Sequence, residues 1–151
     1  MKTADEVRTA LVNTLKQIKI VNGYANDLPD THIHPAYSRL LADDTTDSLY
    51  PKVFVVMQRG VNTRMIALNE KKDLDFVIIF VGKEVAPTDN IDTIVTAYLK
   101  DLERVIFDND TLLGAVQDVS VVEFATDGGV CAPEGVILMH VTTERYRHGN
   151  P

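Results

Sequence analysis

Apolar residues recur at helical spacing in two segments of the chain. In residues 4–18 every third or fourth residue is apolar, and Thr3 with Glu6 has the spacing of a capping box just before that stripe. A longer stripe occupies residues 91–107, and the four residues before it supply helix-breaking and capping side chains. The pattern therefore predicts two amphipathic helices, over 4–18 and 91–107.

Four further segments are rich in β-branched and aromatic residues and are bounded by turn formers, which predicts strands. They are residues 52–59, 74–83, 116–126 and 136–146. Gly128-Gly129 indicates that the last two form a hairpin. Residues 64–68 are interpreted as either a short fifth strand or the tip of a long hairpin. Long loops are expected at about 22–49 and 60–72.

The predicted elements follow one another as helix, strand, strand, helix, strand, strand. Adjacent strands are joined by links too short for a crossover helix, so we expect a mainly antiparallel sheet. Two helices packed on one face of four to five strands give a two-layer α+β fold. A length of 151 residues is typical of one domain, and residues 1–151 are expected to form a single one.

The predicted strands lack the alternation of a sheet that has one wet face. Residues 53–57, 76–81 and 136–139 are apolar at every position. Two helices of roughly 10 Å diameter cover only one face of four strands spaced about 4.8 Å apart. Either the segment 22–49 or another subunit must cover the second face, and both can contribute. The apolar residues available in that segment are Tyr24, Leu28, Ile33, Tyr37, Leu40 and Leu41.

Composition and charge narrow the function classes. The chain is 45% hydrophobic and 25% charged, the mixture of a folded domain. Its net charge of −7 and its scattered basic residues disfavour specific nucleic-acid binding. Cys131 is the single cysteine, which indicates a reducing compartment. No apolar run has the length of a membrane span, and we expect neither membrane association nor a signal peptide.

The sequence carries no recognisable catalytic motif, so we expect no enzymatic activity, no cofactor and no metal. His32 and His34 could hold a metal if both lay on a strand, but no third ligand follows at a recognisable spacing, which favours solvated loop histidines. Cys131 lies in a turn without a neighbouring base, which disfavours a nucleophile. His140 interrupts an apolar strand and is interpreted as a hydrogen-bonded strand residue.

The order of the segments itself resembles a known family. Its landmarks are, in order, Ile20-Val21-Asn22-Gly23-Tyr24, Tyr50-Pro51-Lys52-Val53-Phe54-Val55, Leu74-Asp75-Phe76-Val77-Ile78-Ile79, Asp101-Leu102-Glu103-Arg104-Val105-Ile106, Thr111-Leu112-Leu113-Gly114 and Thr143-Glu144-Arg145-Tyr146. Over about residues 4–147 the chain resembles the tail terminator (minor tail protein U-like) family of tailed bacteriophages. This likeness consists of a succession of elements and not of a catalytic signature.

The resemblance implies a non-enzymatic virion protein of the tail or neck, made in the bacterial host cytoplasm. Its copies would form a hexameric ring that caps the tail tube, stops tube elongation and joins the tail to the head connector. The implied partners are further copies of the chain, the tail tube protein and the head–tail connector or stopper protein. DNA would pass through the lumen of the ring without specific binding.

The family fixes no functional residues that can be transferred, so candidate contacts come from this sequence. Basic and apolar residues in and beside the 60–72 loop are candidates for contact with partners. They are Arg59, Arg64, Met65, Ile66, Leu68, Lys71 and Lys72. The acidic residues Asp43, Asp44 and Asp47 are interpreted as a solvated loop or as part of the lumen, where negative potential would keep DNA from adhering.

Two alternatives to a tail terminator stay open at this stage. Another phage neck component, a head-completion or stopper protein, would share the ring but bind the capsid connector. A small-molecule-binding α+β domain would need a pocket of convergent polar groups, which the sequence does not indicate.

Overall fold

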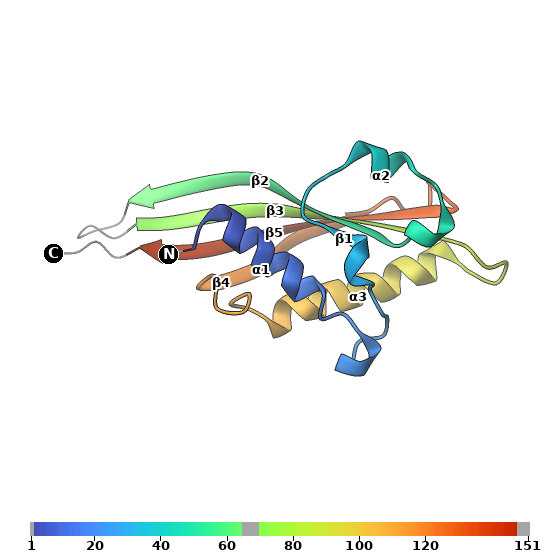
Figure 1. Cartoon of the computed structure of the whole chain (residues 1–151), viewed down its shortest axis with the longest axis horizontal. Helices are drawn as coiled ribbons and strands as arrows, with labels where there is room; N and C mark the ends of the chain where they lie inside the picture. Colours follow the sequence, from blue (N-terminus) through green and yellow to red (C-terminus); the bar gives the residue numbers. More distant parts are fainter. Residues whose placement is uncertain (1, 65–69, 148–151) are drawn as a thin grey trace.

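A computed structural model describes residues 2–64 and 70–147 of the chain. Within these residues a five-stranded sheet packs with three α-helices, which confirms the α+β class (Figure 1). The helices are α1 (Ala4–Leu15), α2 (Arg39–Asp43) and α3 (Ile91–Asp108). The strands are β1 (Ile33–His34), β2 (Lys52–Arg64), β3 (Glu70–Lys83), β4 (Asp118–Thr126) and β5 (Glu134–Arg147). Short 3₁₀ helices occupy residues 20–22, 30–32 and 47–49.

The sheet is mixed, with the spatial order β1-β2-β3-β5-β4. The pairs β2–β3, β3–β5 and β5–β4 are antiparallel, as predicted, and Gly128-Gly129 lies in the β4–β5 connection. The short strand β1 runs parallel to β2. This strand lies in the segment predicted to be irregular, because two residues between a 3₁₀ turn and Pro35 give no periodic signal.

The predicted 60–72 loop is wrong at both ends, because the β2–β3 ladder continues to the pair Arg64–Glu70. Polar residues fill this outer part of the hairpin, so hydrophobic patterning does not mark it as strand. These two strands project as a long arm beyond the helices together with the end of β5, whose ladder with β3 continues to the pair Glu70–Arg147 (Figure 1). Residues 65–69, which hold most of the expected fifth strand or hairpin tip, lie outside the described residues.

Both predicted helices form, and local capping explains where they begin. The Thr3 amide donates to Glu6 Oε2 at 2.7 Å and the Glu6 amide donates to Thr3 Oγ1 at 3.2 Å, which confirms the capping box. Asn90 Oδ1 accepts from the amides of Asp92 and Thr93 at the start of α3. Helix α1 ends at Leu15 and not at residue 18, because a tighter turn follows it.

One hydrophobic core joins α1 and α3 to alternate residues of the sheet. Phe76, Ile78 and Phe80 of β3 are fully buried in it, and α1 contributes Leu11 and Leu15. Helix α1 contacts β1 and β2, whereas α3 contacts β3, β4 and β5. We call the side of the sheet that carries these buried residues the core face, and the opposite side the second face.

Two close contacts fix α3 in its place. A Cβ atom on Gly135 of β5 would lie 2.6 Å from side-chain carbons of Ile91 and Val95, so only glycine permits this approach. Asp101 of α3 is buried and accepts hydrogen bonds from the amides of Ala25 (3.1 Å) and Asn26 (2.9 Å). This carboxylate ties the segment after α1 to the second long helix.

Candidate assembly interface

The second face of the sheet divides into an apolar end and a polar end. Cross-strand pairing aligns Phe54, Ile79 and Leu138 in one row and Val56 and Val77 in the next. Beyond them the register places Arg59 beside Asp75 and Val61 beside Asp73, where the arm begins. The double-sided apolar pattern in the sequence therefore applies to only one end of this face.

The segment between β1 and β2 covers the β2 margin of the apolar end. The rings of His34 and Tyr37 lie 5.3 Å and 5.4 Å from the ring of Phe54, which is fully buried. Lys52 is buried as well, and its Nζ donates to the carbonyls of Ala42 (3.3 Å) and Asp44. The chain thus provides part of the cover that the second face requires.

The rest of the apolar end is left partly exposed. We call this surface the apolar patch. It consists of Val56, Val77, Ile79, Val81, Val136 and Leu138. Leu138, on the β4 side of the patch, is 39% exposed, and the other five are intermediate in burial. The chain itself therefore supplies part of the cover expected for the second face, and the patch remains available to a partner.

Most of the apolar residues named as loop cover do not serve that purpose. Tyr24, Leu28 and Ile33 belong to the core on the other side of the sheet, and Leu40 is exposed. Tyr37 alone of that group stacks on Phe54. The loop prediction fails for these residues because the segment passes around the edge of the sheet before it reaches the second face.

The polar end carries ion pairs and hydrogen bonds within the chain, although Asp73 Oδ1 is buried without a hydrogen-bond partner among the described residues. Lys71 Nζ lies 3.1 Å from Glu144 Oε1 and 3.7 Å from Asp73 Oδ1. The hydrogen bond to Glu144 raises the pKa of Lys71, and the charge of Asp73 adds to this effect. Thr142 Oγ1 donates to Asp75 at 2.7 Å. Most of the charges and hydroxyls at this end are therefore paired within the chain.

The candidate contact residues are separated by the structure. Arg59 and Arg64 are exposed on β2, and neither forms an ion pair within the described part of the chain. Lys71 is already paired with acidic residues of its own chain, and Lys72 is half-buried. Met65, Ile66 and Leu68 lie outside the described residues.

The acidic candidates lie on the segment that covers the β2 margin. Asp47 Oδ1 accepts from Lys83 Nζ at 2.7 Å. Asp44 accepts from the hydroxyl and the amide of Thr46, which lowers the pKa of its carboxyl. Asp43 pairs with Arg39 within α2 at 3.4 Å. Two of the three negative charges are therefore partly compensated by cations of the same chain.

Sequence reasoning missed the two outer edges of the sheet. β1 pairs only with Val53 and Phe54, so the outer edge of β2 is open over residues 56–64. β4 is the last strand on the other side, and its outer edge has no partner strand among the described residues. Met57 on β2 is 42% exposed and Phe124 on β4 is 48% exposed. No local signal distinguishes an edge strand from a central one.

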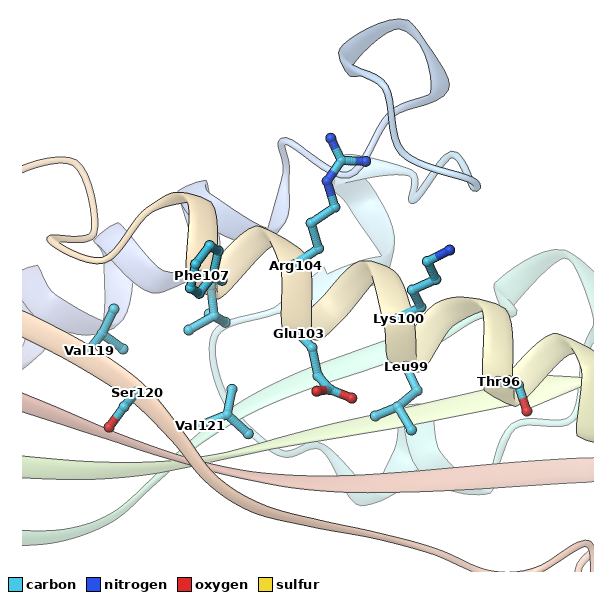
Figure 2. Close-up of a pocket in the computed structure, with 10 residues that line it drawn as sticks. Thr96, Leu99, Lys100, Glu103, Arg104, Phe107, Val119, Ser120 and Val121 are labelled. Carbon is cyan, nitrogen blue, oxygen red and sulfur yellow. The ribbon is translucent and has the colours of Figure 1, made fainter.

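An open groove of about 800 Å³ runs between α3 and β4, next to this second edge. Leu99 and Glu103 point from α3 toward the strand, whereas Lys100 and Arg104 point away (Figure 2). Phe107, at the end of α3, is 84% exposed. Apolar atoms make up most of the exposed lining, although five of its ten residues are polar or charged: Thr96, Lys100, Glu103, Arg104 and Ser120. An open, largely apolar groove of this kind fits a protein surface.

The expectation of solvated loop histidines is wrong. His34 is half-buried on β1, where burial lowers its pKa, and His32 Nδ1 lies 3.0 Å from the Pro51 carbonyl oxygen. Pro35 made this short strand resemble a loop. No cluster of three metal-ligating side chains occurs in residues 2–64 and 70–147.

The described surroundings of His140 and Cys131 give neither residue a catalytic role. His140 lies on strand β5, as interpreted from the sequence, but its Nε2 is 3.9 Å from Glu123 Oε1, too far for the hydrogen bond that the interpretation assumed. Cys131 is exposed, and a hydrogen bond with Asp127 raises the pKa of its thiol, which disfavours the nucleophilic thiolate.

In the described part of the chain no helix is both long and apolar enough to cross a membrane. No protein-family model matches the sequence, and no curated protein matches it.

Proposed function

We propose that this chain is a structural subunit of a ring at the end of a bacteriophage tail. In that position it caps the tail tube, stops tube elongation and joins the tail to the head connector. The ring is part of the virion tail or neck, has no enzymatic role, and lets DNA pass without binding it specifically.

The observation that carries this proposal is the partly exposed apolar patch at the apolar end of the second face. Val77, Ile79 and Val81 are residues typical of a sheet covered on both sides. The segment between β1 and β2 covers Phe54 and reaches Lys83 of β3 and Glu134 of β5 at the end of the sheet, so a partner surface is the remaining source of cover for the patch itself. Exposed apolar surface in one contiguous patch is typical of protein–protein contact.

Three further features support a ring in a tail. The order of elements resembles the tail terminator family over about residues 4–147. The two edges of the sheet are formed by different strands, β1 with β2 on one side and β4 on the other. Different edges suit head-to-tail contacts that close into a ring by rotation. A charge of −7 per copy suits a passage that DNA traverses without adhering.

Removing the gene from the virus that encodes the chain tests the proposal. We expect particles with over-long tail tubes when examined by negative-stain microscopy, and normal tubes when the wild-type chain is supplied. An Ile79→Asp variant should fail to restore length control, because it places a charge on the apolar patch. Val85→Asp is the matched control, since Val85 is exposed outside the patch.

Two results would contradict a terminator role. Tubes of normal length on heads that leak DNA would indicate a stopper protein of the neck instead. Normal particles would remove the chain from tail assembly altogether.

A further inference from the structure

We propose that neighbouring copies join edge to edge, with β4 of one copy added as an antiparallel strand to residues 56–64 of β2 in the next. This inference deepens the proposed ring and rests on it, because it specifies how one subunit binds another. The occupant of each edge is thus a second copy of the same chain.

Both edges are open and of similar length. β4 has nine residues, and no hydrogen bond to its backbone comes from outside the β4–β5 ladder within the described residues. Residues 56–64 of β2 bond only to β3 on their inner side. Unpaired edges of this kind are templates for strand addition, and β2 lacks the proline that commonly blocks it.

The topology gives the two edges opposite directions. β2, β3, β5 and β4 alternate in direction, so β4 runs antiparallel to β2. A second copy placed beside the first by rotation about an axis near the strand direction therefore presents its β2 antiparallel to β4. Such a contact uses different surfaces on the two partners and can close into a ring.

One register brings complementary side chains together. Arg59 pairs with Asp75 and Glu123 pairs with His140 inside the chain, which places both residues on the second face. When Arg59 lies opposite Glu123 of the neighbouring copy, the residues that follow in the two strands also face residues on the same side of the sheet. Each edge carries one bulge, between Met57 and Arg59 in β2 and between Val121 and Glu123 in β4.

In this register the bulge of each strand, Gln58 in β2 and Val122 in β4, lies opposite a part of the other strand that has no bulge. Residues on the same face of the sheet therefore remain opposite one another on both sides of the Arg59–Glu123 pair. Met57 then lies opposite Phe124 on the core face, and Val56 lies opposite Ala125 on the second face. Met57 and Phe124 are both substantially exposed in the free chain, and a methionine beside an aromatic ring is a favourable contact. The register thus covers two exposed apolar side chains and pairs two opposite charges.

Charge selects this pairing over pairing of like edges. The open part of β2 carries Arg59 and Arg64 and no acidic residue, whereas β4 carries Asp118 and Glu123 and no basic residue. Two β2 edges would bring only cations to the seam, and two β4 edges only carboxylates. Opposite charges across strands stabilise a pair and like charges destabilise it.

Disulfide cross-linking of the full chain tests the register. In a Cys131→Ser background, Met57→Cys and Phe124→Cys chains are mixed and oxidised. Within one copy β2 and β4 are separated by β3 and β5, about 14 Å, which exceeds the reach of a disulfide. Any bond between these positions is therefore intermolecular, and a chain with both cysteines should give a ladder of multimers. Met57→Cys mixed with Val21→Cys, a more exposed position outside both edges, is the control.

Charge exchange tests the same contact without a covalent bond. We expect Arg59→Glu to weaken self-association about fivefold per contact, measured by sedimentation velocity over a range of concentrations. Glu123→Arg alone should weaken it similarly, and the double variant should recover the wild-type value. Recovery is the readout that a general structural defect would not produce.

The outcomes separate this inference from the proposed function. If the wild-type chain assembles and the Met57–Phe124 cross-link does not exceed the control, edge pairing is wrong and the ring proposal stands. A chain that stays monomeric at every concentration without cross-linking also overturns edge pairing. If the cross-link forms but deletion of the gene leaves tails normal, edge pairing stands and the tail role is wrong.

Discussion

The two faces of one strand, β3, respond differently to the same kind of residue. Phe76, Ile78 and Phe80 on the core face are fully buried by α1, α3 and the loops around them. Val77 and Ile79, between them in the sequence, remain partly exposed on the second face. Apolar side chains favour burial on either face of the strand. Whether they are buried depends on which elements pack against that face.

Removing a core-face side chain should have the largest effect on the protomer. We expect Phe76→Ala to lower the free energy of unfolding by about 4 kcal/mol, because a fully buried ring is lost and a cavity remains. Urea unfolding followed by circular dichroism measures the change. A loss below about 1 kcal/mol would show that the core face is less well packed than its burial indicates.

On the covered margin of the second face the effect should be smaller. Phe54→Ala should cost about 3 kcal/mol in the same unfolding measurement, because the ring is buried but Tyr37 above it is itself exposed. If the loss of unfolding free energy were as small as that of an exposed residue, the segment around Tyr37 would not cover Phe54 in solution.

Loss of the lysine that fastens this cover should have an intermediate effect. Lys52→Met keeps the aliphatic packing but removes the donor to the Ala42 and Asp44 carbonyls, with an expected loss of about 2 kcal/mol. Faster proteolysis of residues 38–49 should accompany it. A stability change without new cleavage in that segment would assign Lys52 a different role.

At the apolar patch a substitution should destabilise the protomer less than at the core face. Ile79→Asn should lower the free energy of unfolding by about 1 kcal/mol, less than the core substitutions because the side chain is partly exposed, yet it should impair tail-length control in the gene-replacement assay described above. A large loss of protomer stability would show that the patch is internal core and not a contact surface.

The smallest effect is expected at the start of α1. The hydrogen bond from the Thr3 amide lowers the pKa of Glu6 below its usual value of 4.5. A lowered carboxyl pKa contributes stability above that value, and the contribution is lost as pH falls through the folded-state pKa. The small difference in unfolding free energy between wild type and Glu6→Gln should therefore be present at pH 7 and disappear in acid. A difference that persists at low pH would contradict the capping explanation.

Part of the candidate interface was accessible to sequence reasoning. Arg59 was identified as a contact residue, and it lies on the open edge of β2. Glu123 and Phe124 were missed, because strand order cannot be inferred from residues that pair equally well in a central or an edge position. Lys71 was identified for its charge, but its partners Asp73 and Glu144 are brought to it only by cross-strand register.

The sequence alone determined the two long helices, four strands, the last hairpin and the apolar character of both sides of the sheet. These features depend on local periodicity, capping and turn residues, which act over a few positions along the chain. Tertiary structure decided where β1 docks, how far the arm extends, which part of the second face stays uncovered and which charges meet. Those outcomes depend on contacts between residues far apart in the chain, and local patterning carries no information about such distances.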